Sequence, residues 1–117
     1  MNYQPGLHIL SRIYSQNNSL LTNCEPLKLF LEKVIAKHGL HKVGEVFYPF
    51  DNAGYTGVIC LTESHIAFHT WPEHGLLTLD VYLSNHEKNN EHTSKKIFEE
   101  ILVFFEATDH VSQEVLR

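Results

Sequence analysis

The feature that most constrains the fold of this chain is a series of apolar segments in its second half, separated by short polar breaks. Residues 55–61 and 76–83 are rich in Val, Ile, Leu and Tyr, and residues 65–70 place bulky side chains at alternate positions. Such segments are typical of β-strands, and the breaks at residues 62–64 and 72–75 are typical of tight connections. The pattern therefore predicts three successive strands joined by turns.

The flanking segments predict two helices. Apolar side chains recur at helical spacing over residues 26–38, and Pro26 and Gly39 bracket that segment as the start and end of a helix. A second helix is predicted from Thr93 or Ser94, either of which can cap it, to about Phe105.

Three further strands and two turns complete the expected order of elements. The strands are predicted over residues 7–14, 41–48 and 111–116, the last at an edge, and the turns at residues 17–19 and 51–54. The order β-α-β-β-β-β-α-β predicts an α+β fold, a two-layer sandwich of a mostly antiparallel sheet with both helices on one face. At 117 residues we expect a single domain.

Charge and composition narrow the function classes. The chain carries 9 Lys and Arg against 14 Asp and Glu, for a formal net charge of −5, and it has no basic cluster. We therefore expect no nucleic-acid partner and no anionic membrane surface. With no signal peptide pattern and no apolar run near ~20 residues, a cytoplasmic location is expected. Of the two cysteines, Cys24 and Cys60, the latter lies in an apolar run and is predicted to be a small buried hydrophobe.

Several reactive side chains gather in the twelve residues from Thr62 to Glu73. This stretch holds two carboxylates, two histidines, a serine hydroxyl and a Trp-Pro pair. It would be an irregular segment held by buried strands, where chemistry is usually placed. Because Ser64 follows Glu63, its hydroxyl can attack the Glu63 carbonyl through a five-membered ring and exchange the amide for an ester. A lone Glu-Ser pair would more often be an ordinary polar strand start.

The motifs Glu63-Ser64-His65 and His69-Thr70-Trp71-Pro72-Glu73 together resemble the processing site of the bacterial and archaeal S-adenosylmethionine decarboxylases. The resemblance extends from Gly6-Leu7-His8 through Phe47 and Phe50 to the last helix. It implies self-cleavage before Ser64 into chains of residues 1–63 and 64–117, with Ser64 converted to a pyruvoyl group that forms a Schiff base with the substrate. The implied activity is decarboxylation of S-adenosylmethionine to supply the aminopropyl donor of spermidine synthesis.

The resemblance also assigns roles to five further residues. His69 would assist processing, and Thr56 would support it at a position where the family usually has serine. Phe50 and Trp71 would line the substrate pocket, since aromatic faces suit an adenine ring and a sulfonium cation. Glu73 would hold the ribose hydroxyls. The resemblance further implies a homodimer with its pocket near the boundary between protomers.

One expected residue is missing. The family's proton donor is a cysteine twenty residues after the processing serine, in a Cys-Gly segment, and this chain has Ser84-Asn85 there. A serine hydroxyl is far less acidic than a thiol. We therefore expect proton return to be slower, or to be rerouted through His69, His86 or water.

Three functions remain open from the sequence. The first is an S-adenosylmethionine decarboxylase with another proton donor. The second is a pyruvoyl-dependent decarboxylase of arginine or ornithine on the same scaffold, which the change at Ser84 motivates. The third is a non-catalytic paralogue, against which the retained Glu63-Ser64-His65 and His69 count, since a binding module has no need of them.

The chain has nine histidines, but we expect no metal site. His65 and His69 are four residues apart, a spacing that suits zinc on a helix, whereas the local pattern predicts a strand. A strand raises a difficulty, because Ser64 and His69 are an odd number of residues apart and would point to opposite faces. If they act together, the strand must be irregular or cut near Ser64.

Overall fold

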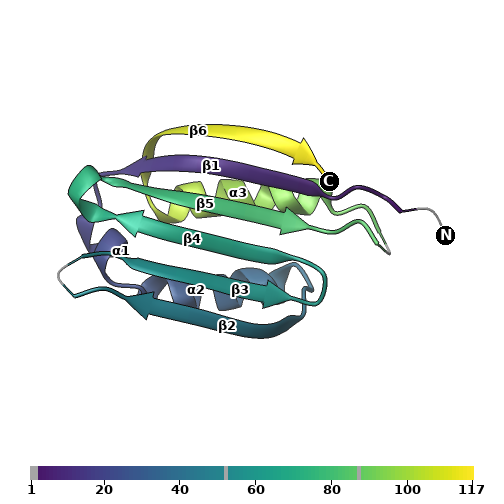
Figure 1. Cartoon of the computed structure of the whole chain (residues 1–117), viewed down its shortest axis with the longest axis horizontal. Coiled ribbons are helices and arrows are strands. Elements are labelled where there is room, and N and C mark those ends of the chain that lie inside the picture. Colours follow the sequence, from purple (N-terminus) through teal and green to yellow (C-terminus); the bar gives the residue numbers. More distant parts are fainter. Residues whose placement is uncertain (1–2, 52, 87) are drawn as a thin grey trace.

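The computed structural model describes residues 3–51, 53–86 and 88–117. Its strands form one six-stranded sheet in the order β2-β3-β4-β5-β1-β6, and all the pairings are antiparallel (Figure 1). The elements are β1 (Leu7–Ser15), α1 (Asn18–Thr22), α2 (Glu25–Lys37), β2 (Lys42–Pro49), β3 (Tyr55–Leu61), β4 (His65–Trp71), the 3₁₀ turn η1 (Pro72–His74), β5 (Leu76–Leu83), α3 (Glu91–Phe104) and β6 (Ala107–Leu116).

The helices α2 and α3 lie side by side on one face of the sheet, so the predicted α+β two-layer architecture is confirmed (Figure 1). Alternation along β4 explains why the chain folds this way. Ile66, Phe68 and Thr70 are buried toward the helices, whereas His69 and Trp71 point to the other face and are exposed. We call that uncovered side of the sheet the open face.

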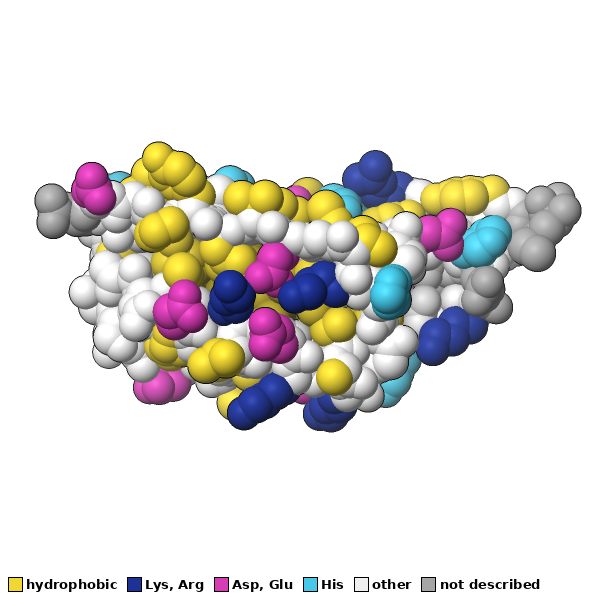
Figure 2. Space-filling model, turned by 90° about the horizontal axis from the view of Figure 1, so that it is seen from below, with side chains coloured by type: hydrophobic (Ala, Val, Ile, Leu, Met, Phe, Trp, Pro, Cys, Tyr) yellow, Lys and Arg dark blue, Asp and Glu magenta, His cyan; other side chains and the backbone are white. Residues whose placement is uncertain are grey.

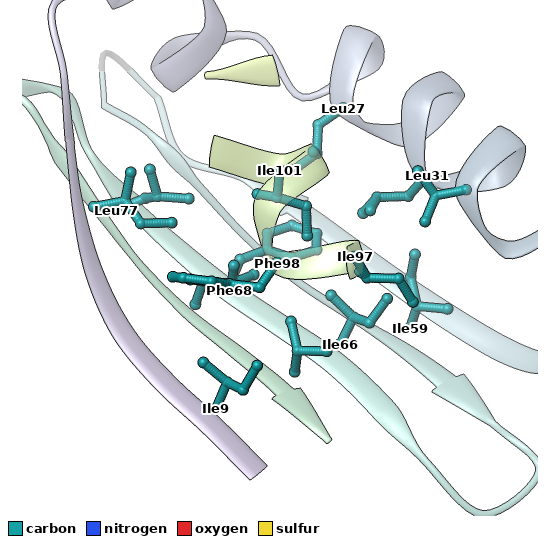
Figure 3. Close-up of a cluster of buried hydrophobic side chains, with 14 of the residues drawn as sticks. Ile9, Leu27, Leu31, Ile59, Ile66, Phe68, Leu77, Ile97, Phe98 and Ile101 are labelled. Atoms are coloured by element: carbon teal, nitrogen blue, oxygen red, sulfur yellow. The ribbon is translucent and has the colours of Figure 1, made fainter. Parts of the chain in front are cut away.

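The core lies between the helices and the sheet (Figure 3). Side chains from both helices and from the central strands meet there: Leu27, Leu31, Ile97, Phe98 and Ile101 from the helices, and Ile9, Ile59, Ile66, Phe68 and Leu77 from the strands. Burying a side chain of this size contributes about 1.5–3 kcal/mol. The apolar stripe predicted for residues 26–38 is therefore what attaches α2 to the sheet.

The two edges of the sheet are strands β2 and β6. Seen from the β2 side, acidic and basic side chains mingle on the surface (Figure 2). The Glu45 carboxylate lies 2.7 Å from Lys42 Nζ and 3.5 Å from Lys28 Nζ of α2. Charged side chains beside an edge strand discourage pairing with another chain.

The structure corrects several expected local features. The segment at residues 17–19 begins helix α1, with the Asn17 side chain accepting a hydrogen bond from Leu20 N–H as its N-cap. Helix α3 begins at Glu91 after Asn90, not at Thr93 or Ser94, and Ser94 is fully buried inside it. The predicted edge strand at 111–116 is longer, starting at Ala107.

The prediction for Cys60 was wrong. Its thiol is free and exposed, because β3 directs Ile59 and Leu61 toward the helices and Cys60 toward the open face. Residues 72–75 form a turn as expected, closed by Gly75 in the left-handed conformation with a φ of 63°. Another expected turn, at residues 51–54, includes Asn52, which lies outside the described residues.

Candidate active site

Ser64 lies in the tight connection between β3 and β4, immediately before the first residue of β4. Leu61 N–H donates a hydrogen bond to the Ser64 carbonyl at 2.9 Å, which leaves Thr62 and Glu63 at the exposed tip of the hairpin. Glu63 is therefore exposed, while Ser64 is half-buried. Because Ser64 precedes the regular strand, the alternation of β4 does not fix where its side chain points.

The residue next to the Ser64 hydroxyl is Ser84. Its backbone N–H donates to Ser64 Oγ at 3.0 Å, because β4 and β5 are neighbours and Ser84 directly follows the end of β5. The expected proton-donor position and the processing serine are thus brought together. This bond holds the Ser64 hydroxyl beside residue 84.

Two asparagines hold the Ser84 segment in place, and sequence reasoning missed both. Asn90 donates from Nδ2 to the Ser84 carbonyl at 2.8 Å, and its backbone N–H donates to Asn85 Oδ1 at 2.6 Å. Asn85 is buried and donates from Nδ2 to the Pro5 carbonyl at 2.8 Å. Asn85 therefore ties the end of β5 to the start of α3 and to the N-terminal segment. The cluster of asparagines at residues 85–90 was the available signal in the sequence.

A cavity of about 520 Å³ opens beside Ser64 at this end of the sheet. It is bounded by the loop that follows α2, by the hairpin tip and by the loop that follows β5. Its polar and charged lining residues include His41, Glu63, Ser64, Ser84, His86 and Lys88. His86 is thus near the Ser64 end of the site, whereas His69 is absent from this lining.

On the open face, a row of polar rings runs across the strands beside Ser64. His8, Tyr82 and His65 pair across β1, β5 and β4, and the His65 ring centroid lies 5.7 Å from that of His8 and 5.6 Å from that of Tyr82. Burial, together with the neighbouring His8, lowers the pKa of His65 below its ordinary value. The ring next to Ser64 is therefore held in its neutral form at neutral pH.

A second group of expected residues assembles at the opposite end of β4. Thr56 and His69 are direct cross-strand partners, and Thr56 Oγ1 shares a hydrogen bond with His69 Nδ1 at 2.5 Å. With Nδ1 engaged, His69 has Nε2 available for proton transfer. The rings of His69 and Trp71 lie 6.0 Å apart on the same face.

These side chains line one cavity of about 280 Å³ together with two more of the expected residues. The lining comprises Phe50, Ala53, Gly54, Thr56, His69, Thr70, Trp71 and Glu73. Every residue that the resemblance assigned to substrate binding or to processing support therefore meets in one place. A pocket with two aromatic faces and a carboxylate suits a flat heterocycle that carries hydroxyl groups.

The structure does not bring the two groups together within one chain. Ser64 precedes β4 and His69 is its fifth residue, and a strand rises about 3.3 Å per residue, so the two lie about 16 Å apart. The two cavities share no lining residue. Within one chain, His69 is therefore too far from Ser64 to exchange a proton with it.

The described part of the chain contains no group of three or more His, Cys, Asp or Glu side chains arranged to hold a metal ion. Its helices are also all too short or too polar to cross a membrane.

Comparison with solved structures identifies the class of fold. The crystal structure of the adenosylmethionine decarboxylase from Aquifex aeolicus matches with a TM-score of 0.86 and 30% sequence identity, over 99% of this chain and 92% of that chain. The sheet and helices described above therefore form an adenosylmethionine decarboxylase-like fold, as expected from the motifs.

Sequence comparison then identifies the family. The family model described as S-adenosylmethionine decarboxylase matches residues 7–117. The S-adenosylmethionine decarboxylase proenzyme of Thermoplasma volcanium is 32% identical over 96% of this chain and 83% of its own length. That of Aquifex aeolicus is 44% identical over 66% of this chain, a match that spans 57% of the relative. The chain belongs to the S-adenosylmethionine decarboxylase family.

Proposed function

We propose that this chain is a carboxy-lyase that decarboxylates S-adenosylmethionine, after cleaving itself between Glu63 and Ser64 into chains of residues 1–63 and 64–117. The observation that carries the proposal is the position of Ser64. Ser64 follows the exposed Glu63 in a tight connection, its hydroxyl accepts a hydrogen bond from the Ser84 backbone N–H, and it lines a cavity. The names of its relatives support the same activity.

The proposed cleavage needs only the chain and one water molecule. Ser64 Oγ attacks the Glu63 carbonyl carbon, the amide becomes an ester, and the Ser64 nitrogen takes up the hydroxyl proton. Removal of the Ser64 α-proton then expels the Glu63 carboxylate and leaves a dehydroalanine. Water hydrolyses this residue to a pyruvoyl group and ammonia. His69, with Nδ1 bonded to Thr56, is the proposed base, acting from a second copy of the chain.

The position of Ser64 fits a pyruvoyl group. It directly precedes β4, so a new chain end there would be anchored by that strand, and Ser84 N–H is placed to bond an oxygen at residue 64. When present, the pyruvoyl group would supply an electron sink for the decarboxylation. The chain's own residues would bind and orient the substrate and return a proton to its α-carbon.

The cavity at Thr56, His69 and Trp71 supports an adenosyl substrate over arginine or ornithine. The rings of Phe50 and Trp71 can contact adenine and a sulfonium centre, and Glu73 can accept hydrogen bonds from the ribose hydroxyls. Arginine and ornithine lack the adenosyl group that these residues would bind. Ser84 remains the feature that favours a different amino-acid substrate.

We also propose that the enzyme is a homodimer that pairs through the open face. Large apolar side chains are exposed on that face, on both of its outer strands and at the end of β4: Val46, Tyr48, Trp71, Val111 and Val115. A two-fold axis across the strands would place the Ser64 end of one β4 near the His69 end of the other. The 16 Å gap within one chain would then be bridged between two chains, and each dimer would hold two complete sites.

Proton return is proposed to involve the Ser84 corner. Ser84 and His86 both line the cavity beside Ser64. An imidazole is a better acid near neutral pH than a hydroxyl, so a histidine is the proposed donor: His86, or His69 of the second chain, with a bound water as the alternative.

One combined experiment tests the proposal. Intact-protein mass spectrometry should show two chains split before residue 64. The second chain should be lighter than the simple hydrolysis product by the mass of ammonia, and it should carry a reactive ketone. The same preparation should then release carbon dioxide from S-adenosylmethionine faster than from arginine or ornithine. Cleavage with a preference for arginine or ornithine would establish the alternative substrate. A single uncleaved mass, with no activity on any of the three, would indicate a non-catalytic paralogue.

A further inference from the structure

The Thr70 hydroxyl joins three segments of the chain at a buried point on the helix side of β4, whereas the flanking His69 and Trp71 point to the open face. Its Oγ1–H donates to the Leu21 carbonyl of α1 at 2.7 Å, and its oxygen accepts from Tyr55 N–H, at the start of β3, at 2.9 Å. Thr70 is 6% exposed. The hydroxyl therefore uses its single proton and one lone pair in bonds between elements.

The loop that enters β3 is packed directly against this hydroxyl. A Cβ added to Gly54 would lie 2.1 Å from Thr70 Oγ1 and 2.6 Å from the Thr70 carbonyl oxygen, closer than atoms can approach. Phe50 N–H donates to the Gly54 carbonyl at 2.9 Å. The packing of Gly54 against Thr70 therefore also fixes the backbone of Phe50. Only glycine lets the loop approach so closely.

A second bond secures the same junction from the helix side. The Tyr55 ring is fully buried, and its hydroxyl donates to the Leu20 carbonyl of α1 at 2.8 Å. Burial raises the pKa of Tyr55, which keeps this hydroxyl protonated as a donor. Helix α1 and the start of β3 are thus tied to β4 through Thr70 and Tyr55.

The tied segments carry the functional side chains of the second cavity. Phe50 comes from the loop, Thr56 follows Tyr55 on β3, and His69 and Trp71 flank Thr70 on β4. The contact of Gly54 and Tyr55 with Thr70 joins the loop that carries Phe50 to the strand that carries Trp71. The separation of the two aromatic rings therefore depends on this contact.

We propose that Thr70 is a positioning residue, whose buried hydroxyl sets the distance between Phe50 and Trp71 and thereby the specificity of the pocket for a flat aromatic substrate group. The effect of Thr70 on substrate binding rests on the proposed function. The effect of Thr70 on the shape of the pocket does not, and it can be measured without an activity assay.

The chain has a single tryptophan, Trp71, whose fluorescence reports directly on this cavity. Trp71 is 38% exposed, which leaves room for its exposure to increase. In Thr70→Val the loop loses its anchor, so acrylamide should quench Trp71 more strongly than in the wild type. Thr70→Ser keeps the hydroxyl and should restore wild-type quenching.

Activity gives a second readout. In cleaved protein, Thr70→Val should raise KM for S-adenosylmethionine between about tenfold and a hundredfold while changing kcat less, as expected for a displaced binding group. Thr70→Ser should stay close to the wild type. If the wild type has no decarboxylase activity, the proposed function fails while the quenching result still decides the role of Thr70.

The matched control is Ser15→Ala, which also removes a buried bridging hydroxyl. Ser15 Oγ donates to the Phe105 carbonyl at 2.6 Å and accepts from Asn17 N–H at 3.0 Å, and neither partner lines the cavity. Ser15→Ala should lower the melting temperature without changing the quenching of Trp71. If Thr70→Val does not fold, Gly54→Ala disturbs the same contact from the loop side. The proposal would be overturned if whichever of Thr70→Val and Gly54→Ala folds shows the same Trp71 quenching as the wild type. It would also be overturned if Ser15→Ala increases Trp71 quenching by the same amount.

Discussion

The backbone N–H of Ser84 donates a hydrogen bond to Ser64 Oγ at 3.0 Å, which joins two residues that are twenty positions apart in the sequence. Because the donor is the backbone and not the side chain, the bond survives a change of the side chain at residue 84. The hydroxyl proposed for self-cleavage and the side chain at the proposed proton-return position can therefore be altered independently. Substitutions at residue 84 therefore test proton return while leaving the hydrogen bond to Ser64 Oγ in place.

We expect Ser84→Cys to speed turnover without changing the rate of self-cleavage. A thiol titrates near pH 8.5 in water and delivers a proton far more readily than a serine hydroxyl. A tenfold gain would correspond to about 1.4 kcal/mol of the barrier. The measurement is kcat per mole of pyruvoyl group, with Ser84→Ala as the control. If Ser84→Ala matches the wild type, the hydroxyl is not the donor and His86 is the next residue to change. No gain for Ser84→Cys on any of the three substrates would contradict the prediction that residue 84 occupies the proton-donor position.

Thr56→Ala should slow self-cleavage by about tenfold, a small part of the 10²–10⁴-fold that a positioned acid or base contributes. The reason is the hydrogen bond between Thr56 Oγ1 and His69 Nδ1, which orients the imidazole. Thr56→Ser keeps a hydroxyl there and should cleave at close to the wild-type rate. A time course of intact mass after synthesis measures both. Equal rates for Thr56→Ala and Thr56→Ser would show that the bond does not assist processing.

The exposed thiol of Cys60 offers a test of the proposed dimer. Cys60 lies on the open face, whereas Cys24 lies at the start of α2 in the helix layer. A maleimide reagent should therefore label Cys60 more slowly as protein concentration rises through the dimerisation range, while labelling of Cys24 stays constant. Light scattering on the same samples gives the oligomeric state. Labelling of Cys60 that is independent of concentration in protein shown to be dimeric would place the interface elsewhere.

Acid should weaken the attachment of α2 to α3. Burial would raise the pKa of Glu100, but hydrogen bonds from His38 and Lys37 outweigh it, and the net result is a lowered pKa. A carboxyl with a lowered folded-state pKa stabilises the fold above its ordinary value of 4.5, and this stability is lost as pH falls through the folded-state value. Glu100→Gln should therefore be less stable than the wild type at neutral pH, with the difference shrinking below about pH 4.5. Urea unfolding at several pH values measures it, and a difference independent of pH would contradict the expectation.

Much of the fold was predictable because it follows from periodicity. The alternation of bulky Ile66 and Phe68 with less buried neighbours indicated a strand with one covered face, and the helical spacing from Leu27 to Ile35 indicated the face that covers it. Element ends were less accurate because local caps decide them. Helix α3 starts after Asn90, whose side chain and backbone are both used by the Ser84 segment, and no propensity indicates such a bond.

The candidate site was predictable as a set of residues but not as an arrangement. The motif at residues 63–73 identified both Ser64 and His69. It did not indicate that they lie far apart within one chain, because a motif gives residue types and not the distance between side chains. Cys60 was misplaced for a related reason, because a run of apolar residues does not reveal that one face of its strand is uncovered. Thr70 gave no signal, since its partners Leu21 and Tyr55 are distant in sequence.

The distance between Ser64 and His69 along β4 has a genetic consequence. In the proposed dimer each site takes Ser64 from one chain and His69 from the other. Ser64→Ala and His69→Ala would each be inactive alone, yet a mixed dimer of the two would contain one site with both residues intact and one with neither. Two defective alleles of this gene should therefore complement each other when expressed together, and a cell that carries both should recover part of the activity that each has lost.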